Sequence, residues 1–111
     1  MPENFQVYLP EREPKMEDYE GYDRIEVVHF LLNGEAGNER EKVIRTRIKE
    51  IKALGLDVRE VDIDTDEGDI KGTKIIVAGA LGDVCADKRR RYLLDHSADK
   101  VIIDTSLTID Y

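Results

Sequence analysis

Cys85 is the residue of this chain best suited to covalent chemistry, and it is the only cysteine. Gly82 and Asp83 precede it, and this pattern predicts a helix that begins there with Asp83 as its N-cap. Backbone N–H groups and the helix dipole in the first turn of a helix favour a thiolate, which would be a nucleophile. The alternative is that Cys85 is a small apolar residue packing the helix onto a sheet.

A second group with chemical potential is acidic. Asp62, Asp64 and Asp66 alternate along one short segment, and carboxylate oxygens of this kind hold Mg²⁺ or Ca²⁺. With Glu35 they resemble the acidic metal site of toprim domains, but Gly68 follows too soon for that pattern. We favour a solvated acidic turn, and the sequence assigns no metal and no cofactor.

Two glycine-containing turns follow apolar runs and precede helical patterns, one at Gly34 and the other at Gly82. Either turn would admit a phosphate at a helix N-terminus, although neither has the full dinucleotide-binding spacing. A further apolar run, 101–103, ends at Asp104. We therefore expect a small anion or nucleotide near these strand ends, and the candidate ligand-binding residues are Gly34, Glu35, Asp64, Gly82, Asp83, Cys85 and Asp104.

Alternating strand and helix patterns must position these residues. Apolar, β-branched runs predict strands near 25–32, 56–63, 74–80 and 100–104, and residues 107–111 extend the last strand or form a fifth. Helical spacing predicts helices over 38–54 and 83–96. The connection over 63–74 has no helical pattern and could be a hairpin, which would make one strand antiparallel.

This order, β-α-β-β-α-β, predicts an α/β fold: a small Rossmann-like sheet of four to five mostly parallel strands in two or three layers, with two main helices. The carboxyl ends of parallel strands meet at one edge of a sheet. Open α/β sheets bind their ligands at that edge. The fold class therefore predicts where the candidate residues gather.

Residues 1–23 differ from the domain predicted over 24–111. They contain all three prolines and seven acidic but only two basic residues. Phe5, Val7 and Leu9 alternate with polar residues, which predicts a short strand. This acidic arm is either a loose tail or a segment that docks on its own domain or on a second copy of the chain. Self-association through residues 1–23 is therefore one expectation.

The net charge of −8 is poorly suited to neutralising phosphates, so we do not expect nucleic-acid binding. The basic run 88–91 is the local exception, and we expect it to be a solvated helix face. The apolar runs are too short to cross a membrane, and no signal-peptide pattern opens the chain. We therefore expect a cytoplasmic protein that does not enter a membrane.

The segment Val77–Asp87, followed by a helix and the strand 101–103, resembles the nucleophile segment of isochorismatase-like cysteine hydrolases. The resemblance covers about a quarter of the chain and implies a helix-borne nucleophilic cysteine at Cys85. That family also needs an Asp at the end of its first strand, where this chain has Asn33. We therefore do not carry the activity over.

Three functions remain open at this point. We favour a small binding or regulatory module without a complete catalytic constellation. The first alternative is a cysteine-dependent hydrolase-like enzyme that uses Cys85 at a helix N-terminus. The second alternative is a structural subunit whose arm, residues 1–23, mediates assembly.

Overall fold

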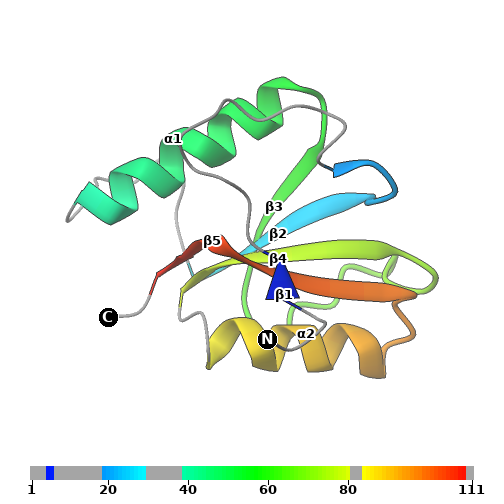
Figure 1. The fold of residues 1–111 in the computed structure, drawn as a ribbon. Coiled ribbons are helices and arrows are strands. Elements are labelled where there is room, and N and C mark those ends of the chain that lie inside the picture. The colour runs from blue at the N-terminus through cyan, green and yellow to red at the C-terminus, as the bar shows by residue number, and fades with distance from the viewer. Residues whose placement is uncertain (1–4, 7–18, 30–38, 81–83, 110–111) are drawn as a thin grey trace.

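Five parallel strands form a single sheet in the computed structural model, which describes residues 5–6, 19–29, 39–80 and 84–109. Their spatial order is β1-β5-β4-β2-β3, and helices α1 and α2 cover the two faces (Figure 1). The α/β class and the order of elements predicted from the sequence are confirmed. The elements are β1 (Phe5–Gln6), β2 (Arg24–Val28), α1 (Glu39–Ala53), β3 (Asp57–Val61), β4 (Lys74–Ala80), α2 (Cys85–Asp95) and β5 (Lys100–Ile109).

The two helices lie on opposite faces because of the strand order. The connection from β2 to β3 and the connection from β4 to β5 run in opposite directions along the sheet. Right-handed crossovers that run in opposite directions place their helices on opposite faces. The result is three layers, with α1 on one side of the sheet and α2 on the other (Figure 1).

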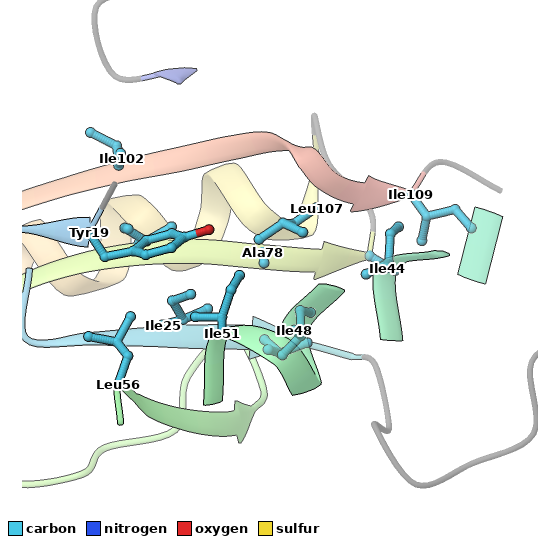
Figure 2. Close-up of a cluster of buried hydrophobic side chains, with 13 residues drawn as sticks. Tyr19, Ile25, Ile44, Ile48, Ile51, Leu56, Ala78, Ile102, Leu107 and Ile109 are labelled. Carbon is cyan, nitrogen blue, oxygen red and sulfur yellow. The ribbon is translucent and has the colours of Figure 1, made fainter. Parts of the chain in front are cut away.

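Helix α1 covers its face through a stripe of isoleucines. Ile44, Ile48 and Ile51 recur at helical spacing and are fully buried against β2, β4 and β5 (Figure 2). Val43 and Leu54, which the same spacing placed with them, are 46% and 37% exposed. The apolar stripe is therefore narrower than the sequence predicted, and the helix is held by its central turns.

The connection between β3 and β4 is not a hairpin. Both strands pair in parallel with β2, which lies between them, so the chain crosses β2 to reach β4. Residues 62–73 make this crossing without a helix, and we call them the crossover. The crossover packs on the α2 face, where Ile70 is buried with Val77 and Leu93. A hairpin would pair β3 with β4 directly, whereas each of these strands pairs with β2.

Helix α2 begins one residue later than predicted. Its first helical residue is Cys85 and its N-cap is Val84, whose side chain makes no capping hydrogen bond. Asp83, the predicted N-cap, lies outside the described residues. The helix ends at Asp95, and the chain then turns through Ser97, which has a positive φ of 72°.

Parts of the acidic arm contact the domain. Phe5 and Gln6 form β1, which pairs in parallel with Ile103 and Asp104 of β5. Tyr19 is 1% exposed and belongs to the apolar cluster under α1 (Figure 2). The described parts of residues 1–23 therefore dock on their own domain, while self-association through the arm and the division at residue 24 stay predictions.

Among the described residues, no helix combines the length and apolar character needed to cross a membrane.

Candidate functional site

The carboxyl edge of the sheet has a switch point between β2 and β4. These strands are neighbours, and the connection that follows β2 leads to α1 on one face, while the connection that follows β4 leads to α2 on the other (Figure 1). In open α/β sheets a crevice opens where successive connections leave in opposite directions, and ligands bind there. The topology therefore selects one position along the edge.

The backbones of β2 and β4 come close together at this position. Gly79 of β4 pairs with Val28 of β2 and has a positive φ of 103°. A Cβ atom on Gly79 would lie 2.3 Å from the carbonyl oxygen and 2.7 Å from the amide nitrogen of Val28. Only glycine fits this backbone conformation at this spacing, so the sequence of β4 is constrained where the strand reaches the edge.

Four of the predicted ligand residues belong to the two connections that flank the switch point. Gly34 and Glu35 follow β2, whereas Gly82 and Asp83 follow β4. All four lie outside the described residues, so their roles stay predictions. Cys85, the fifth, is the first residue of α2 and is partly buried against the apolar cluster on that face.

The other two predicted ligand residues, Asp64 and Asp104, lie away from the switch point. Asp104 was expected to follow its strand, but β5 continues to Ile109, so Asp104 lies within the strand and not at its carboxyl end. Asp64 is an exposed residue of the crossover after β3, whereas Asp104 is fully buried on β5. Asp104 Oδ1 accepts hydrogen bonds from Ser106 N at 3.0 Å and from Ser106 Oγ at 2.6 Å. Strands β3 and β5 are three strand spacings apart, about 14 Å. The strand order therefore separates Asp64 from Asp104.

The three aspartates of the possible metal site do not converge. Asp62 Oδ1 lies 3.3 Å from Nε2 of His29, at the end of β2. Asp66 Oδ1 accepts a hydrogen bond from Gly68 N at 3.0 Å, which stabilises a turn. Within the described part of the chain, no group of three or more His, Cys, Asp or Glu residues could hold a metal ion.

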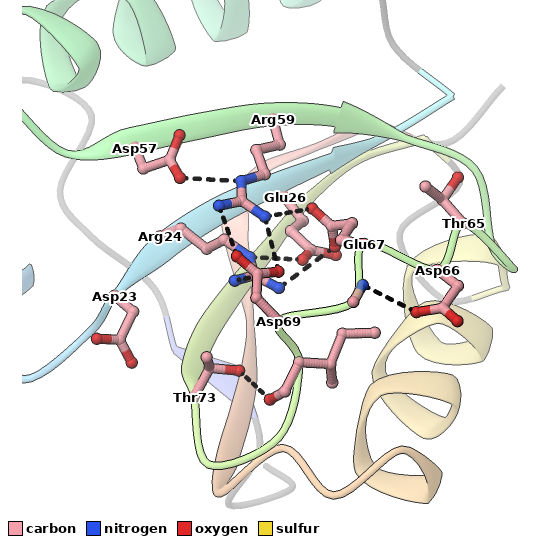
Figure 3. Close-up of polar contacts among 12 residues, drawn as sticks. Asp23, Arg24, Glu26, Asp57, Arg59, Thr65, Asp66, Glu67, Asp69 and Thr73 are labelled. Carbon is pink, nitrogen blue, oxygen red and sulfur yellow. Dashed lines mark hydrogen bonds and ion pairs between the residues drawn. The ribbon is translucent and has the colours of Figure 1, made fainter.

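A second candidate site is a set of charged side chains buried between β2, β3, the crossover and α2. We call it the arginine cluster, and Figure 3 shows most of it. It lies on a face of the sheet rather than at its edge. Arg24, Glu26 and Arg89 are buried and Glu67 is 10% exposed, whereas the side chains of Asp57 and Asp69 are 49% and 52% exposed. The cluster consists of Arg24, Glu26, Asp57, Arg59, Glu67, Asp69 and Arg89.

Arg89 of α2 is the centre of the cluster and is 0% exposed. Its Nε donates to Glu26 Oε1 at 2.7 Å, and its Nη2 donates to Glu67 Oε1 at 2.8 Å. Its Nη1 donates to the backbone carbonyls of Ile63 and Thr65 at 3.1 and 2.7 Å. One guanidinium therefore ties the helix to the sheet and to the crossover at once.

Arg24 and Arg59 complete the cluster from the neighbouring strands (Figure 3). Arg24 Nε donates to Glu26 Oε2 at 2.8 Å, and its Nη2 donates to Glu67 Oε1 at 3.3 Å. Arg59 forms a bidentate pair with Asp69, both bonds being 3.0 Å, and donates to Glu67 Oε2 at 2.9 Å. Glu67 thus accepts hydrogen bonds from three arginines.

The cluster shifts the proton affinities of its acids. Burial, together with a hydrogen bond to Glu67, raises the pKa of Glu26 from 4.5 to about 7, against the opposing effect of Arg24 and Arg89. Burial also raises the pKa of Glu67, but the hydrogen bonds with Glu26 and Arg59 outweigh it and the net pKa is lowered. The hydrogen bond from Arg59 lowers the pKa of Asp69. The proton affinity is therefore raised at Glu26 and lowered at Glu67, and the titration of each depends on the other.

Sequence reasoning missed this cluster and was wrong about the basic run 88–91. Lys88 and Arg91 are exposed as expected, but Arg89 is completely buried. One signal was present in the sequence: Glu26 interrupts an apolar, β-branched strand. A charge in a strand that is buried on both faces needs a charged partner. The sequence pattern does not say which distant residue supplies that partner.

No protein-family model, no curated protein and no solved structure matches this chain. The chemistry of the two candidate sites therefore follows from their own geometry. The guanidiniums of the arginine cluster are committed to protein carboxylates, which indicates a structural role. The carboxyl edge presents the N-terminus of α2 at a switch point, and such a helix end attracts anions.

Proposed function

We propose that this chain is a small binding or regulatory module that takes a small anion or a nucleotide at the carboxyl ends of β2 and β4. The observation that carries the proposal is the strand order, because β2 and β4 are neighbours whose following connections lead to opposite faces. The predicted ligand residues Gly34, Glu35, Gly82 and Asp83 belong to those two connections.

The start of α2 supports the anionic character of the ligand. The first N–H groups of a helix have no partner within the helix, and Val84 at the N-cap supplies no side-chain acceptor. A phosphate at this place would accept hydrogen bonds from the backbone and interact favourably with the helix dipole. Recognition by backbone groups also suits a chain with a net charge of −8, in which a broad basic surface is not expected.

The test is a nuclear magnetic resonance titration of the ¹⁵N-labelled full chain with inorganic phosphate and, separately, with ADP. We expect amide shifts to concentrate at His29, Ala80 and Cys85, and to be small at Lys100 on the opposite edge of the sheet. No shift at millimolar ligand, or shifts spread evenly over the chain, would contradict the proposal.

A negative charge introduced at the N-cap of α2 should have opposite effects on the stability of the fold and on anion binding. Val84→Asp places a carboxylate where it caps α2, so we expect it to raise the melting temperature. The same carboxylate repels a bound anion and should weaken phosphate binding roughly fivefold, which corresponds to about 1 kcal/mol. Val43→Asp is the matched control, because Val43 on α1 is 46% exposed and Val84 is 44% exposed. Equal affinities in the two variants would count against a site at α2.

The second proposal is a cysteine-dependent activity at Cys85. Its supporting observation is that Cys85 is the first helical residue of α2, where the helix dipole favours a thiolate. Against it stands the packing of the side chain on the apolar cluster of that face. The rate of thiol alkylation in the folded chain, compared with the rate in the unfolded chain, distinguishes a reactive Cys85 from a packed one.

A further inference from the structure

We propose that the arginine cluster is a proton-dependent latch. It holds the crossover on the sheet while Glu26 and Glu67 share one proton, and it loosens when that proton leaves. This inference concerns the crossover and does not depend on the anion site proposed above.

The crossover depends on polar contacts for its attachment. Among residues 62–73, only Ile70 is fully buried, whereas the others are exposed or partly exposed. Arg89 holds the first half of the segment through the carbonyls of Ile63 and Thr65. Glu67 holds its middle, because its carboxylate is inserted among three guanidiniums and is only 10% exposed. Loss of the Glu67 contacts would therefore release the crossover from the sheet.

Charged groups surround Glu26 on the face of the sheet that α2 covers. Every packed element contributes: Arg24 from β2, Asp57 and Arg59 from β3, Glu67 and Asp69 from the crossover, and Arg89 from α2. On the β4 side the neighbour in register is Val77, which is apolar. Three guanidiniums thus face four carboxyl groups, and one proton on the Glu26–Glu67 pair would bring the formal charge to zero. Of the four, Asp57 and Asp69 are about half exposed to solvent, so the two shielded carboxyls are Glu26 and Glu67. Both carboxyls accept hydrogen bonds from Arg89, at 2.7 and 2.8 Å, so Glu26 and Glu67 lie against the same buried guanidinium.

Opening the crossover changes the proton affinity of this pair. In the closed state burial and the bond to Glu67 keep the pKa of Glu26 at about 7. When the crossover leaves, water reaches Glu26 and its pKa falls toward the ordinary value of 4.5. At a pH between 4.5 and about 7, opening of the crossover therefore releases a proton from Glu26. In this range a rise in pH favours the open state by up to tenfold per pH unit.

The latch reaches the carboxyl edge of the sheet. The crossover begins at Asp62, whose carboxylate lies 3.3 Å from the His29 ring, and His29 N donates to Val61 O at 3.1 Å. Displacement of the crossover would therefore change the surroundings of the residue that follows β2. The structure in this way connects the protonation of a buried pair with the edge next to the switch point.

Hydrogen exchange of the full chain tests the latch. The reporters are the amides of Gly72, bonded to Ser97 O at 2.8 Å, and Thr73, bonded to Ile70 O at 3.1 Å. After correction for the intrinsic pH dependence of exchange, we expect their protection factors to fall by up to tenfold per pH unit between about pH 5 and 7. We expect them to level off above that range. Protection that does not change with pH would overturn the proposal.

Two variants of the cluster and one control variant make the test specific. Glu26→Gln has the shape of the protonated acid, and its amide can donate to Glu67 in place of the proton, so its protection should be independent of pH. Glu50→Gln makes the same change at an exposed position of α1 and should keep the wild-type slope. Glu67→Gln removes the other member of the pair and should also flatten the profile. A wild-type slope in either cluster variant would refute the shared proton, and circular dichroism confirms that each variant is folded.

Discussion

Replacement of Gly79 by alanine should destabilise the fold more than any ordinary glycine replacement. Gly79 has a φ of 103°, which costs a residue with a side chain roughly 1–3 kcal/mol. The new Cβ would also lie 2.3 Å from the Val28 carbonyl oxygen, so β2 and β4 must separate at the centre of the sheet. Such overpacking costs about 1–3 kcal/mol more. The sum, roughly 2–6 kcal/mol, is a large part of the roughly 5–15 kcal/mol that stabilises a typical domain.

A matched control is available in the same chain. Gly55 follows α1 with the same φ of 103°, but nothing lies within 4 Å of its added Cβ. Gly55→Ala therefore carries only the conformational cost, and the difference between the two variants measures the close approach at Val28. Thermal and urea unfolding of both variants should show a melting temperature lower by roughly 10–20 °C for Gly79→Ala and a clearly smaller loss for Gly55→Ala. Equal losses would refute the argument from the Val28 contact.

Four further outcomes are expected. Arg89→Ala should cost roughly 3–5 kcal/mol in urea unfolding because it leaves buried carboxylates unpaired, whereas Arg91→Ala, with a side chain 71% exposed, should change stability by under about 0.5 kcal/mol. The raised pKa of Glu26 favours the folded state below pH 4.5, and this contribution, up to about 3 kcal/mol, should disappear as the pH rises through about 7. Iodoacetamide should alkylate Cys85 much more slowly in the folded chain than in urea, because the side chain packs on the apolar cluster, and rapid alkylation of the folded chain would support the cysteine-dependent alternative. Light scattering of the full chain and of a chain that begins at residue 19 tests assembly, and identical oligomeric states would remove that role from the arm.

Local pattern was sufficient for most of the elements. The strand predicted over residues 74–80 has those bounds, because a short apolar, β-branched run between polar ends favours a buried strand. Helix α1 ends before Gly55, whose positive φ fits the predicted helix stop. These features depend on residues that are close together in the sequence.

The parts that depend on distant residues could not be predicted. The sequence suggested a hairpin over residues 63–74 because it shows no helix there, but the position of β3 is decided by its pairing with β2. The basic run 88–91 looked uniformly solvated, yet Arg89 faces the sheet and meets Glu26, 63 residues earlier in the chain. Long-range charge pairing has no sequence period, so a single sequence does not reveal it.

The pairing of β1 with β5 has a consequence for the order in which the protein folds. Phe5 and its partner Ile103 are separated by almost the whole sheet along the chain. Contacts with a large sequence separation close late and slow the folding of a domain. The edge of β5 is therefore covered only after the β4–β2–β3 part of the sheet has been made. An N-terminal fusion that holds residues 5–6 away from β5 would leave that edge open for pairing with another chain.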